Sequence, residues 1–205
     1  MRDTLLLVWD APNMDMTLSS IIGARPSGAQ RPRFQALGRW LLAEAGRLSH
    51  TSEQSVHARA TLFCNVPPQH AEQMRPWVDA VRSNGFAVFA KPKTSDDSDV
   101  DPEMSALIAE LAATDSLAGV IVASADGRNF KTQLQELAAS GVATTVLSFR
   151  EQANWAIQDP EITFVDCEAI PNLFQEPLPR VDLAHLPAEG AWLEPLQPLE
   201  SLLRR

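Results

Sequence analysis

Short apolar segments alternate with amphipathic segments along most of this chain, and this alternation restricts the fold more than any other feature of the sequence. Five segments have the length and the apolar content of buried strands: Thr4–Asp10, His57–Val66, Phe86–Pro92, Leu117–Ser124 and Ala143–Phe149. Ile162–Asp166 is a candidate for a sixth strand. Strands that alternate with helices are typical of βαβ units, so the sequence predicts an α/β fold with a mainly parallel sheet.

The segments between these strands carry helical patterns of apolar residues. Four helices are predicted, at Phe34–Gly46, His70–Gly85, Pro102–Ala113 and Phe130–Gly141. Glycine closes several of them, as is common just past a helix C-terminus, and Pro76 predicts a kink or restart in the second. Helices between parallel strands cover both faces of the sheet. The predicted architecture is therefore a Rossmann-like three-layer α/β/α sandwich.

The composition changes after about Asn172, where prolines become frequent and no helical or strand period is present. A chain of 205 residues fits one domain. We therefore expect an α/β domain over residues 1–171 and an extended, proline-rich C-terminal tail over residues 172–205. The tail either packs on the domain, which we favour, or presents a site to a partner.

The overall composition is that of an ordinary globular protein, but the net charge is −9. This charge counts against a broad basic face for nucleic acid, although cations bound at an acidic cluster can invert the local potential. The apolar run Leu5–Trp9 is too short to span a membrane and lacks a signal-peptide pattern, which predicts a cytoplasmic protein without a membrane partner. Cys64 and Cys167 are expected to be buried, reduced thiols.

Carboxylates follow two of the predicted strands. Asp10 ends the first strand, and Asp126 follows the fourth within Ser124–Phe130. Ligands of parallel α/β sheets bind at the carboxyl ends of the strands, so both residues lie where a site is expected. For each there is a structural alternative, since Asp10-Ala-Pro-Asn13 and Asp126-Gly127 are also typical turn sequences.

A third acidic group follows the strand Phe86–Pro92. The segment Asp96–Glu103 contains five carboxylates. Asp101 either faces the same crevice as Asp10 or caps a helix that begins at Pro102, and the two roles are compatible. We expect Asp96, Asp97 and Asp99 to form a solvated acidic loop.

Three convergent aspartates suit a hard divalent cation. Mg²⁺ takes oxygen ligands, and one or two such ions can activate water for phosphodiester hydrolysis. The four histidines are scattered without ligand spacing. The sequence contains no GxGxxG, P-loop, HExxH or GxSxG motif, so it gives little support to other chemistry.

The chain contains, in this order, the motifs VWDAPNMDM, SDVDPEM and VIVASADGRNF. Together they resemble the NYN family of PIN-like domains, and the resemblance covers roughly residues 1–170. The chain looks like an actinobacterial branch of that family. The matching positions are Asp10 with Asn13, Val100 with Asp101, and Ser124 with Asp126. The resemblance implies a ribonuclease that uses Mg²⁺ or Mn²⁺ at Asp10, Asp101 and Asp126, with Asn13, Ser124 and Asn129 in support. It also implies RNA as the partner.

The chain departs from the family pattern in one place. The family commonly has a further aspartate just before the phenylalanine of the third motif, whereas this chain has Arg128 and Asn129 before Phe130. An amide in place of a carboxylate lowers the charge of the site and its expected affinity for metal.

Basic residues near the same sheet edge are candidate phosphate contacts. Lys91 and Lys93 leave the third strand, and Arg128 and Lys131 open the helix after the fourth. Arg25, Arg31 and Arg33 could form a basic rim. The alternative for all of them is ordinary surface charge.

Two further functions stay open at this point. The net charge, Asn129 and the tail also fit a catalytically weak module that binds RNA or protein, and homo-oligomers are compatible with the sequence. A phosphatase or nucleotide hydrolase could use the same acidic edge.

Overall fold

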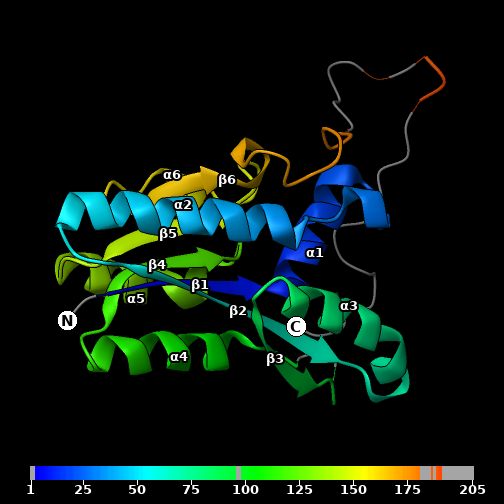
Figure 1. Cartoon of the computed structure of the whole chain (residues 1–205). Coiled ribbons are helices and arrows are strands. Elements are labelled where there is room, and N and C mark those ends of the chain that lie inside the picture. The colour runs from blue at the N-terminus through cyan, green and yellow to red at the C-terminus, as the bar shows by residue number, and fades with distance from the viewer. Residues whose placement is uncertain (1–2, 96–97, 181–185, 187, 191–205) are drawn as a thin grey trace.

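A six-stranded parallel sheet forms the centre of the molecule (Figure 1). The computed structural model describes residues 3–95, 98–180, 186 and 188–190. The strands are β1 (Thr4–Asp10), β2 (His57–Val66), β3 (Ala87–Pro92), β4 (Leu117–Ala123), β5 (Ala143–Ser148) and β6 (Thr163–Asp166). The five predicted strands and the candidate sixth are thus confirmed, with ends shifted by one residue at most.

The strand order is β3-β2-β1-β4-β5-β6, and every neighbouring pair is parallel. The chain starts in the middle of the sheet, moves outward to β3, crosses back to β4 and moves outward again to β6. Val8 of β1 therefore pairs with Thr61 on one side and with Val122 on the other. The strand order reverses between β1 and β4, so a crevice is expected at their carboxyl ends.

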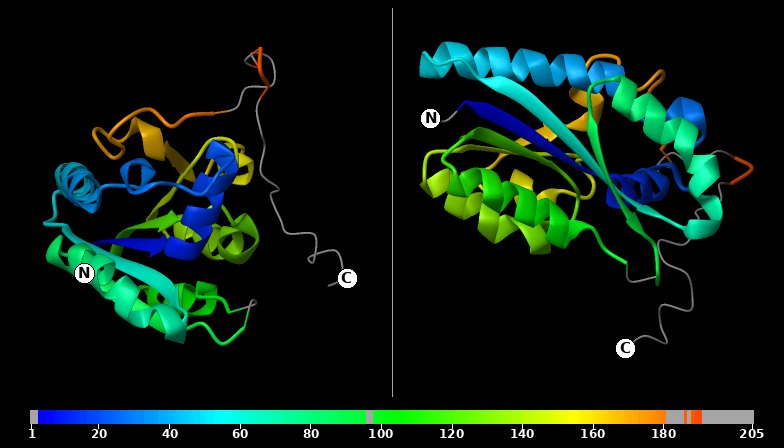
Figure 2. Two further views of the ribbon diagram at one scale, coloured as in Figure 1. Left: turned by 90° about the vertical axis from the view of Figure 1, so that its right-hand side faces the viewer. Right: turned by 60° about the horizontal axis from the view of Figure 1, so that its bottom comes forward.

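Helices cover both faces of the sheet, which confirms the predicted three-layer sandwich (Figure 2). They are α1 (Ala11–Ile22), α2 (Phe34–Ser52), α3 (Ala71–Ser83), α4 (Asp101–Ala113), α5 (Gly127–Ala139) and α6 (Asn154–Ile157). Short 3₁₀ turns lie at Gly28–Gln30, Pro68–His70 and Cys167–Ala169. Within the described residues, no helix has the length and apolar character needed to cross a membrane.

The side chains of β1 alternate between two apolar clusters, because successive residues of a strand point to opposite faces. Leu5, Leu7 and Trp9 pack with residues of α1, α2 and α3. Leu6 and Val8 pack with residues of α4 and α5. Because both faces of β1 are buried, the sequence of this strand is a continuous run of apolar residues.

The helix α1 was missed by the sequence analysis, which assigned no helix after Asp10. Asp10 is the N-cap of α1, and Pro12 lies in its first turn, where the missing N–H costs nothing. The helix ends at Gly23, whose φ of 75° favours glycine. The Asx-type turn that was one reading of Asp10 is therefore the beginning of a helix.

Two predicted helix boundaries differ from the structure by three residues or more. α2 continues past Gly46 to Ser52, and α5 begins at Gly127 rather than at Phe130. Pro76 lies inside α3 without ending it. Its missing N–H falls in the second turn of the helix, where it removes one hydrogen bond only.

The segment after β6 packs against the face that carries α2. Leu173 and Leu178 are buried in the first apolar cluster, and the Arg33 N–H donates to the Leu173 carbonyl at 2.8 Å. Arg180 donates to Glu151 and Glu168. Residues 171–180 therefore follow the domain surface, and most of the remaining tail lies outside the described residues.

Cys64 and Cys167 are free and buried, as the sequence predicted. Burial raises the pKa of the Cys64 thiol to about 11 and that of Cys167 further above its ordinary value. Neither thiol is therefore a reactive nucleophile near neutral pH.

Gly119 of β4 is the position where the sheet leaves least room for a side chain. A Cβ here would lie 2.9 Å from Leu5 Cδ1 and 3.3 Å from the Ala143 carbonyl oxygen. We expect Gly119→Ala to lower the free energy of unfolding by about 1–3 kcal/mol, measured by urea denaturation. Gly46→Ala is the control, because no atom lies within 4 Å of its Cβ and the residue is helical, so it should stabilise by about 0.5–1 kcal/mol. Equal effects of the two substitutions would contradict this packing.

Candidate metal centre

The carboxyl ends of β1 and β4 lie side by side, because Trp9 of β1 pairs with Ala123 of β4. Asp10 is the last residue of β1, and Ser124 directly follows β4. The helices that begin at this edge of the sheet include α1, α4 and α5, and the strands point toward it, to the right in Figure 1. Helix N-termini favour anions, so this edge favours carboxylates and phosphates alike.

Asp10 is buried, with 3% of its surface exposed. Its Oδ1 accepts the Asn13 N–H at 3.0 Å, which caps α1. Its Oδ2 accepts the Ser124 hydroxyl at 3.2 Å. Both oxygens therefore have a donor, and the side chain is held in one orientation.

Asn13 and Ser124 join the turn after β1 to the loop after β4. The Asn13 amide oxygen accepts the Ala125 N–H at 2.8 Å. The Ser124 hydroxyl, which donates to Asp10, accepts the Asp126 N–H at 3.2 Å. The structure thus brings Asn13 and Ser124 into contact with the backbone around the predicted ligands, where they fix its geometry.

Asp101 is the first residue of α4 and is also buried, with 7% of its surface exposed. The predicted N-cap role of Asp101 is wrong, because Val100 is the capping residue and Asp99 Oδ1 accepts the Asp101 N–H at 3.0 Å. Asp99 is therefore part of the helix start, whereas Asp96 and Asp97 lie outside the described residues. The Asp101 carboxylate is left to face the sheet edge.

One oxygen of Asp101 accepts no hydrogen bond from the described side chains, although the Asp10 carboxyl group lies close enough to share a proton with Asp101. Its Oδ2 accepts the side-chain amide of Asn129, which lies in the first turn of α5 and caps no helix. Its Oδ1 is buried and accepts no hydrogen bond from the described residues. A buried carboxylate oxygen without a donor is rare in proteins and often marks an ion or a shared proton.

The carboxyl groups perturb one another. Burial, reinforced by the nearby charge of Asp101, raises the pKa of Asp10 to about 7. Burial also raises the pKa of Asp101, as do the charges of Asp99 and Asp126. The structure therefore brings Asp10 and Asp101 into direct electrostatic contact, with Asp126 near Asp101.

The structure does not contain an assembled three-ligand centre. In the described part of the chain, no three His, Cys, Asp or Glu side chains are grouped closely enough to hold a metal ion. The donor set nevertheless fits a hard cation: the contacting groups are carboxylates, two of them repel each other, and one oxygen is free of donors. Their closure around an ion requires side-chain movement.

Two of the three lysines predicted to bind substrate already have protein partners. Lys91 Nζ donates to Glu103 at 2.7 Å and to the Asp99 carbonyl at 2.9 Å, and so holds the loop before α4. Lys131 Nζ lies 3.6 Å from Asp159 Oδ2. Lys93 is exposed, and the side chain of Arg128 lies outside the described residues.

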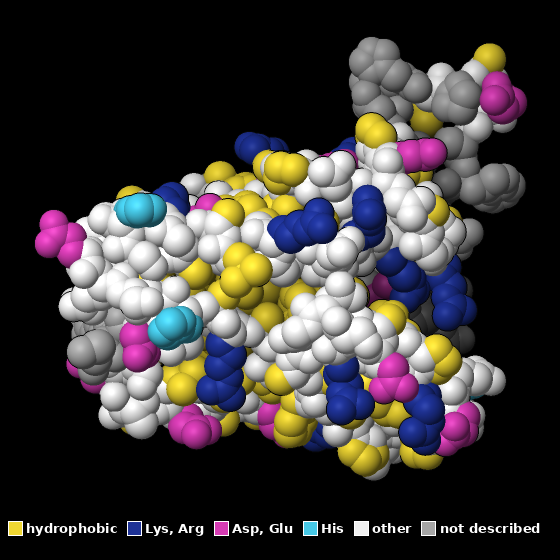
Figure 3. All heavy atoms as spheres, viewed as in Figure 1, with side chains coloured by type: hydrophobic (Ala, Val, Ile, Leu, Met, Phe, Trp, Pro, Cys, Tyr) yellow, Lys and Arg dark blue, Asp and Glu magenta, His cyan; other side chains and the backbone are white. Residues whose placement is uncertain are grey.

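The arginines of the predicted rim differ in their surroundings. Arg31 pairs with Asp15 at 3.2 Å, whereas Arg25 and Arg33 are exposed. Figure 3 shows Lys and Arg side chains on this face interspersed with hydrophobic and uncharged ones, and more numerous on its right-hand half, toward the strand ends. They do not merge into one basic surface.

Sequence reasoning missed Trp155, which contacts the loop of the site. The Trp155 indole N–H donates to the Ala125 carbonyl at 3.1 Å, one residue before Asp126. The two residues are far apart in sequence and share no periodic pattern, so no sequence signal connects them.

This fold and edge define an α/β domain of the PIN-like nuclease type. Residues 4–168 match the NYN domain, so the chain belongs to the NYN domain family, as its motifs predicted. A solved structure, that of a protein of unknown function from Vibrio parahaemolyticus, is similar in fold, with a TM-score of 0.59 and 18% sequence identity. The match covers 84% of this chain and 96% of that one. No curated protein matches this chain.

The raised pKa of Asp10 makes the stability of the metal-free protein depend on pH. The unfolded chain ionises Asp10 near pH 4, whereas the folded protein does so near 7. The unfolded state therefore loses this proton first as the pH rises, and the folded state loses stability between about pH 4 and 7, by at most about 1.4 kcal/mol per pH unit.

Asp10→Asn keeps an oxygen for the helix cap and removes this ionisation. We expect the variant, in EDTA, to melt at a higher temperature than the wild type near pH 8, with a difference that shrinks toward pH 4. Thermal unfolding across this range measures it, with Asp79→Asn on the exposed face of α3 as the control. A variant that is less stable than the wild type at every pH would refute the buried repulsion.

Proposed function

We propose that this NYN domain is a metal-dependent ribonuclease that hydrolyses RNA phosphodiester bonds at Asp10, Asp101 and Asp126. The observation that carries the proposal is the buried pair of Asp10 and Asp101 at the point where the strand order reverses, with one oxygen left without a donor. Clustered carboxylates with raised pKa values in a crevice are typical of functional sites.

The protein residues have distinct roles in this proposal. Asp10 and Asp101 hold the cation, and Asp126 completes the ligand set from the start of α5. Asn13 and Ser124 hold Asp10 and the loop after β4 in fixed positions relative to each other through the hydrogen bonds described above. When bound, Mg²⁺ or Mn²⁺ would lower the pKa of a water molecule and neutralise the developing charge on the phosphate.

The helix N-termini at this edge support the same substrate. α1, α4 and α5 all begin beside the carboxylates, and their positive ends favour a phosphate group. Without a cation the three aspartates would repel that phosphate, which explains why the proposed activity depends on metal.

The test is cleavage of a labelled RNA pool by the purified chain with Mn²⁺ or Mg²⁺. We expect Asp126→Asn and Asp101→Asn to reduce the rate by on the order of a hundredfold, since even indirect partners of metal ligands contribute that much. Arg82→Gln, an exposed substitution on α3, is the control. Cleavage that survives both aspartate substitutions would refute the assignment, and hydrolysis of small phosphoesters alone would indicate a phosphatase or nucleotide hydrolase.

A second function, a catalytically weak module that binds RNA or protein, is favoured by one observation. The Asn129 amide donates to Asp101 Oδ2, which a further carboxylate at this position could not do. This hydrogen bond occupies one of the oxygens that a metal would need. The module should bind RNA without turnover.

Asn129→Asp separates the two functions. A further carboxylate beside Asp101 should destabilise the metal-free protein by repulsion and increase the rise in melting temperature on addition of Mn²⁺, because ligand binding stabilises the folded state. Thermal unfolding in EDTA and in Mn²⁺ measures both effects. Asn129→Ala is the matched control, since it removes the hydrogen bond without adding charge. A Mn²⁺-induced rise no larger than that of the wild type would show that Asn129 does not face a metal site.

A further inference from the structure

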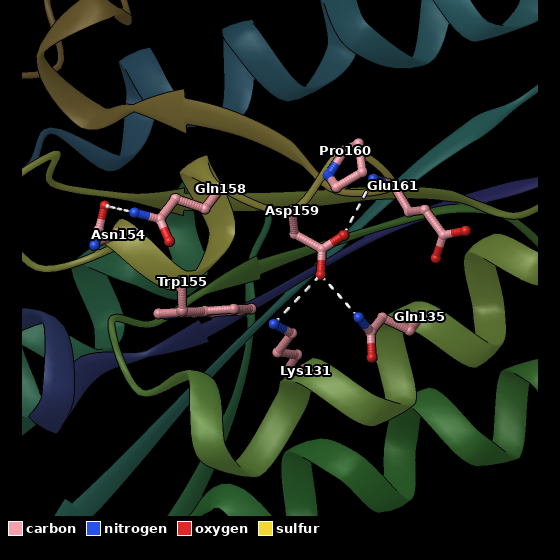
Figure 4. Close-up of a pocket in the computed structure, with 8 residues that line it drawn as sticks. All are labelled: Lys131, Gln135, Asn154, Trp155, Gln158, Asp159, Pro160 and Glu161. Carbon is pink, nitrogen blue, oxygen red and sulfur yellow. Dashed lines mark hydrogen bonds and ion pairs between the residues drawn. The ribbon is translucent and has the colours of Figure 1, made fainter.

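An open hollow of about 730 Å³ lies beside the proposed site, between α5, α6 and the loop that leads to β6 (Figure 4). Its lining consists of Lys131, Gln135, Asn154, Trp155, Gln158, Asp159, Pro160 and Glu161. The proposed hydrolysis at the three aspartates uses none of these residues except Lys131, which was predicted as a phosphate contact. The proposed hydrolysis therefore does not account for the other seven lining residues of the hollow.

Trp155 forms a fixed aromatic wall of the hollow. Its indole N–H donates to the Ala125 carbonyl at 3.1 Å, and part of the ring packs against the apolar cluster under α4 and α5. The rest of the half-buried ring lines the open space. A flat aromatic surface that is already immobilised favours stacking of another flat ring, because little conformational entropy is lost on binding.

The polar groups of the hollow are arranged around Asp159. Asp159 Oδ2 accepts the Gln135 amide at 2.8 Å and lies 3.6 Å from Lys131 Nζ, while Oδ1 accepts the Glu161 N–H at 3.1 Å. Figure 4 shows these three partners converging on Asp159, with Trp155 beside them. The Lys131 side chain is 45% exposed, so its charge remains accessible to solvent.

The charge of the lining residues favours an uncharged nucleobase over a phosphate as the group that binds in the hollow. Among the described lining residues, Lys131 is the single cation, against the two carboxylates of Asp159 and Glu161. Asn154 and Gln158 add amides, which can donate to and accept from the edge of a base. Lys131 at the rim suits the phosphate that follows the base along a strand.

The hollow is placed to act together with the three aspartates. α5 starts directly after Asp126, and Lys131 lies five residues further along the chain. At 1.5 Å per residue this is roughly 7.5 Å along the helix, about the length of two stacked nucleotides. A base on Trp155 would therefore bring a neighbouring phosphate to the sheet edge.

We infer that the hollow beside Trp155 binds one unpaired nucleobase of the RNA strand and so sets the position at which that strand crosses the aspartates. The inference rests on the proposed function for its substrate class, single-stranded RNA. Trp155 supplies the stacking surface, and Lys131 binds the adjoining phosphate.

The experiment is binding of a labelled oligoadenylate to the full chain, by fluorescence anisotropy in Ca²⁺, with the oligonucleotide checked for integrity afterwards. Trp155→Ala should weaken binding about tenfold, and Trp155→Phe should weaken it less, because stacking is retained. Trp77→Ala, on α3 across the sheet, should leave affinity unchanged.

The phosphate contact of Lys131 is tested by the salt dependence of binding. Lys131→Gln should reduce the slope of log K against log[salt] by about one, the value for one lost phosphate contact, whereas Trp155→Ala should leave the slope unchanged. Circular dichroism verifies the fold of each variant.

A second measurement needs no protein variant and covers the case in which Trp155→Ala fails to fold. Oligonucleotides with a single abasic position, moved along the strand, should show one position where loss of the base weakens wild-type binding about tenfold. Equal binding at every position, or wild-type affinity in folded Trp155→Ala, would overturn the inference even if RNA is cleaved. Binding that requires Trp155 without any cleavage would support it and refute the nuclease assignment alone.

Discussion

The hydrogen bonds that join the ends of β1 and β4 are the constraint on which the candidate site depends. Ser124 links the Asp10 carboxylate to the Asp126 backbone, and Asn13 holds the Ala125 N–H. The chain leaves the two strands toward opposite faces of the sheet, and these bonds join the two loops beyond the last paired residues, Trp9 and Ala123. They keep Asp10 buried next to Asp101, an arrangement that costs stability until a proton or a cation relieves the repulsion.

The sequence predicted the sheet and the proximity of Asp10 and Asp101 at its edge, because both depend on local signals. Apolar runs marked the strands, and the ends of adjacent parallel strands meet regardless of the details of packing. The hydrogen bond from the Asp101 N–H to Asp99 and the contact of Trp155 with Ala125 could not be predicted in this way. These contacts form between side chains that come together only after folding, and the spacing of residues in the sequence does not indicate which side chains will do so. α1 was missed because its first residues are equally suited to a turn.

Several basic side chains near the candidate site are paired with carboxylates of the same chain. In each of three ion pairs a carboxylate neutralises a basic side chain that the sequence alone would suggest as a contact for nucleic acid. The pairs are Lys91–Glu103, Lys131–Asp159 and Arg31–Asp15. With a net charge of −9, the protein has little long-range attraction for a polyanion. Under the proposed function, recognition would rely on short-range contacts, namely a cation held by carboxylates, helix N-termini and aromatic stacking, which act only once the strand is in place.

The segment after β6 shows that the folding unit is longer than the family match. The match ends at residue 168, yet Leu173 and Leu178 complete the apolar cluster under α2, and Arg180 is held by Glu151 and Glu168. A chain cut at the end of the match would expose that cluster to water and leave the two glutamates without their arginine. We therefore expect the smallest piece that folds by itself, the piece to be expressed or fused to another protein, to extend at least to Arg180.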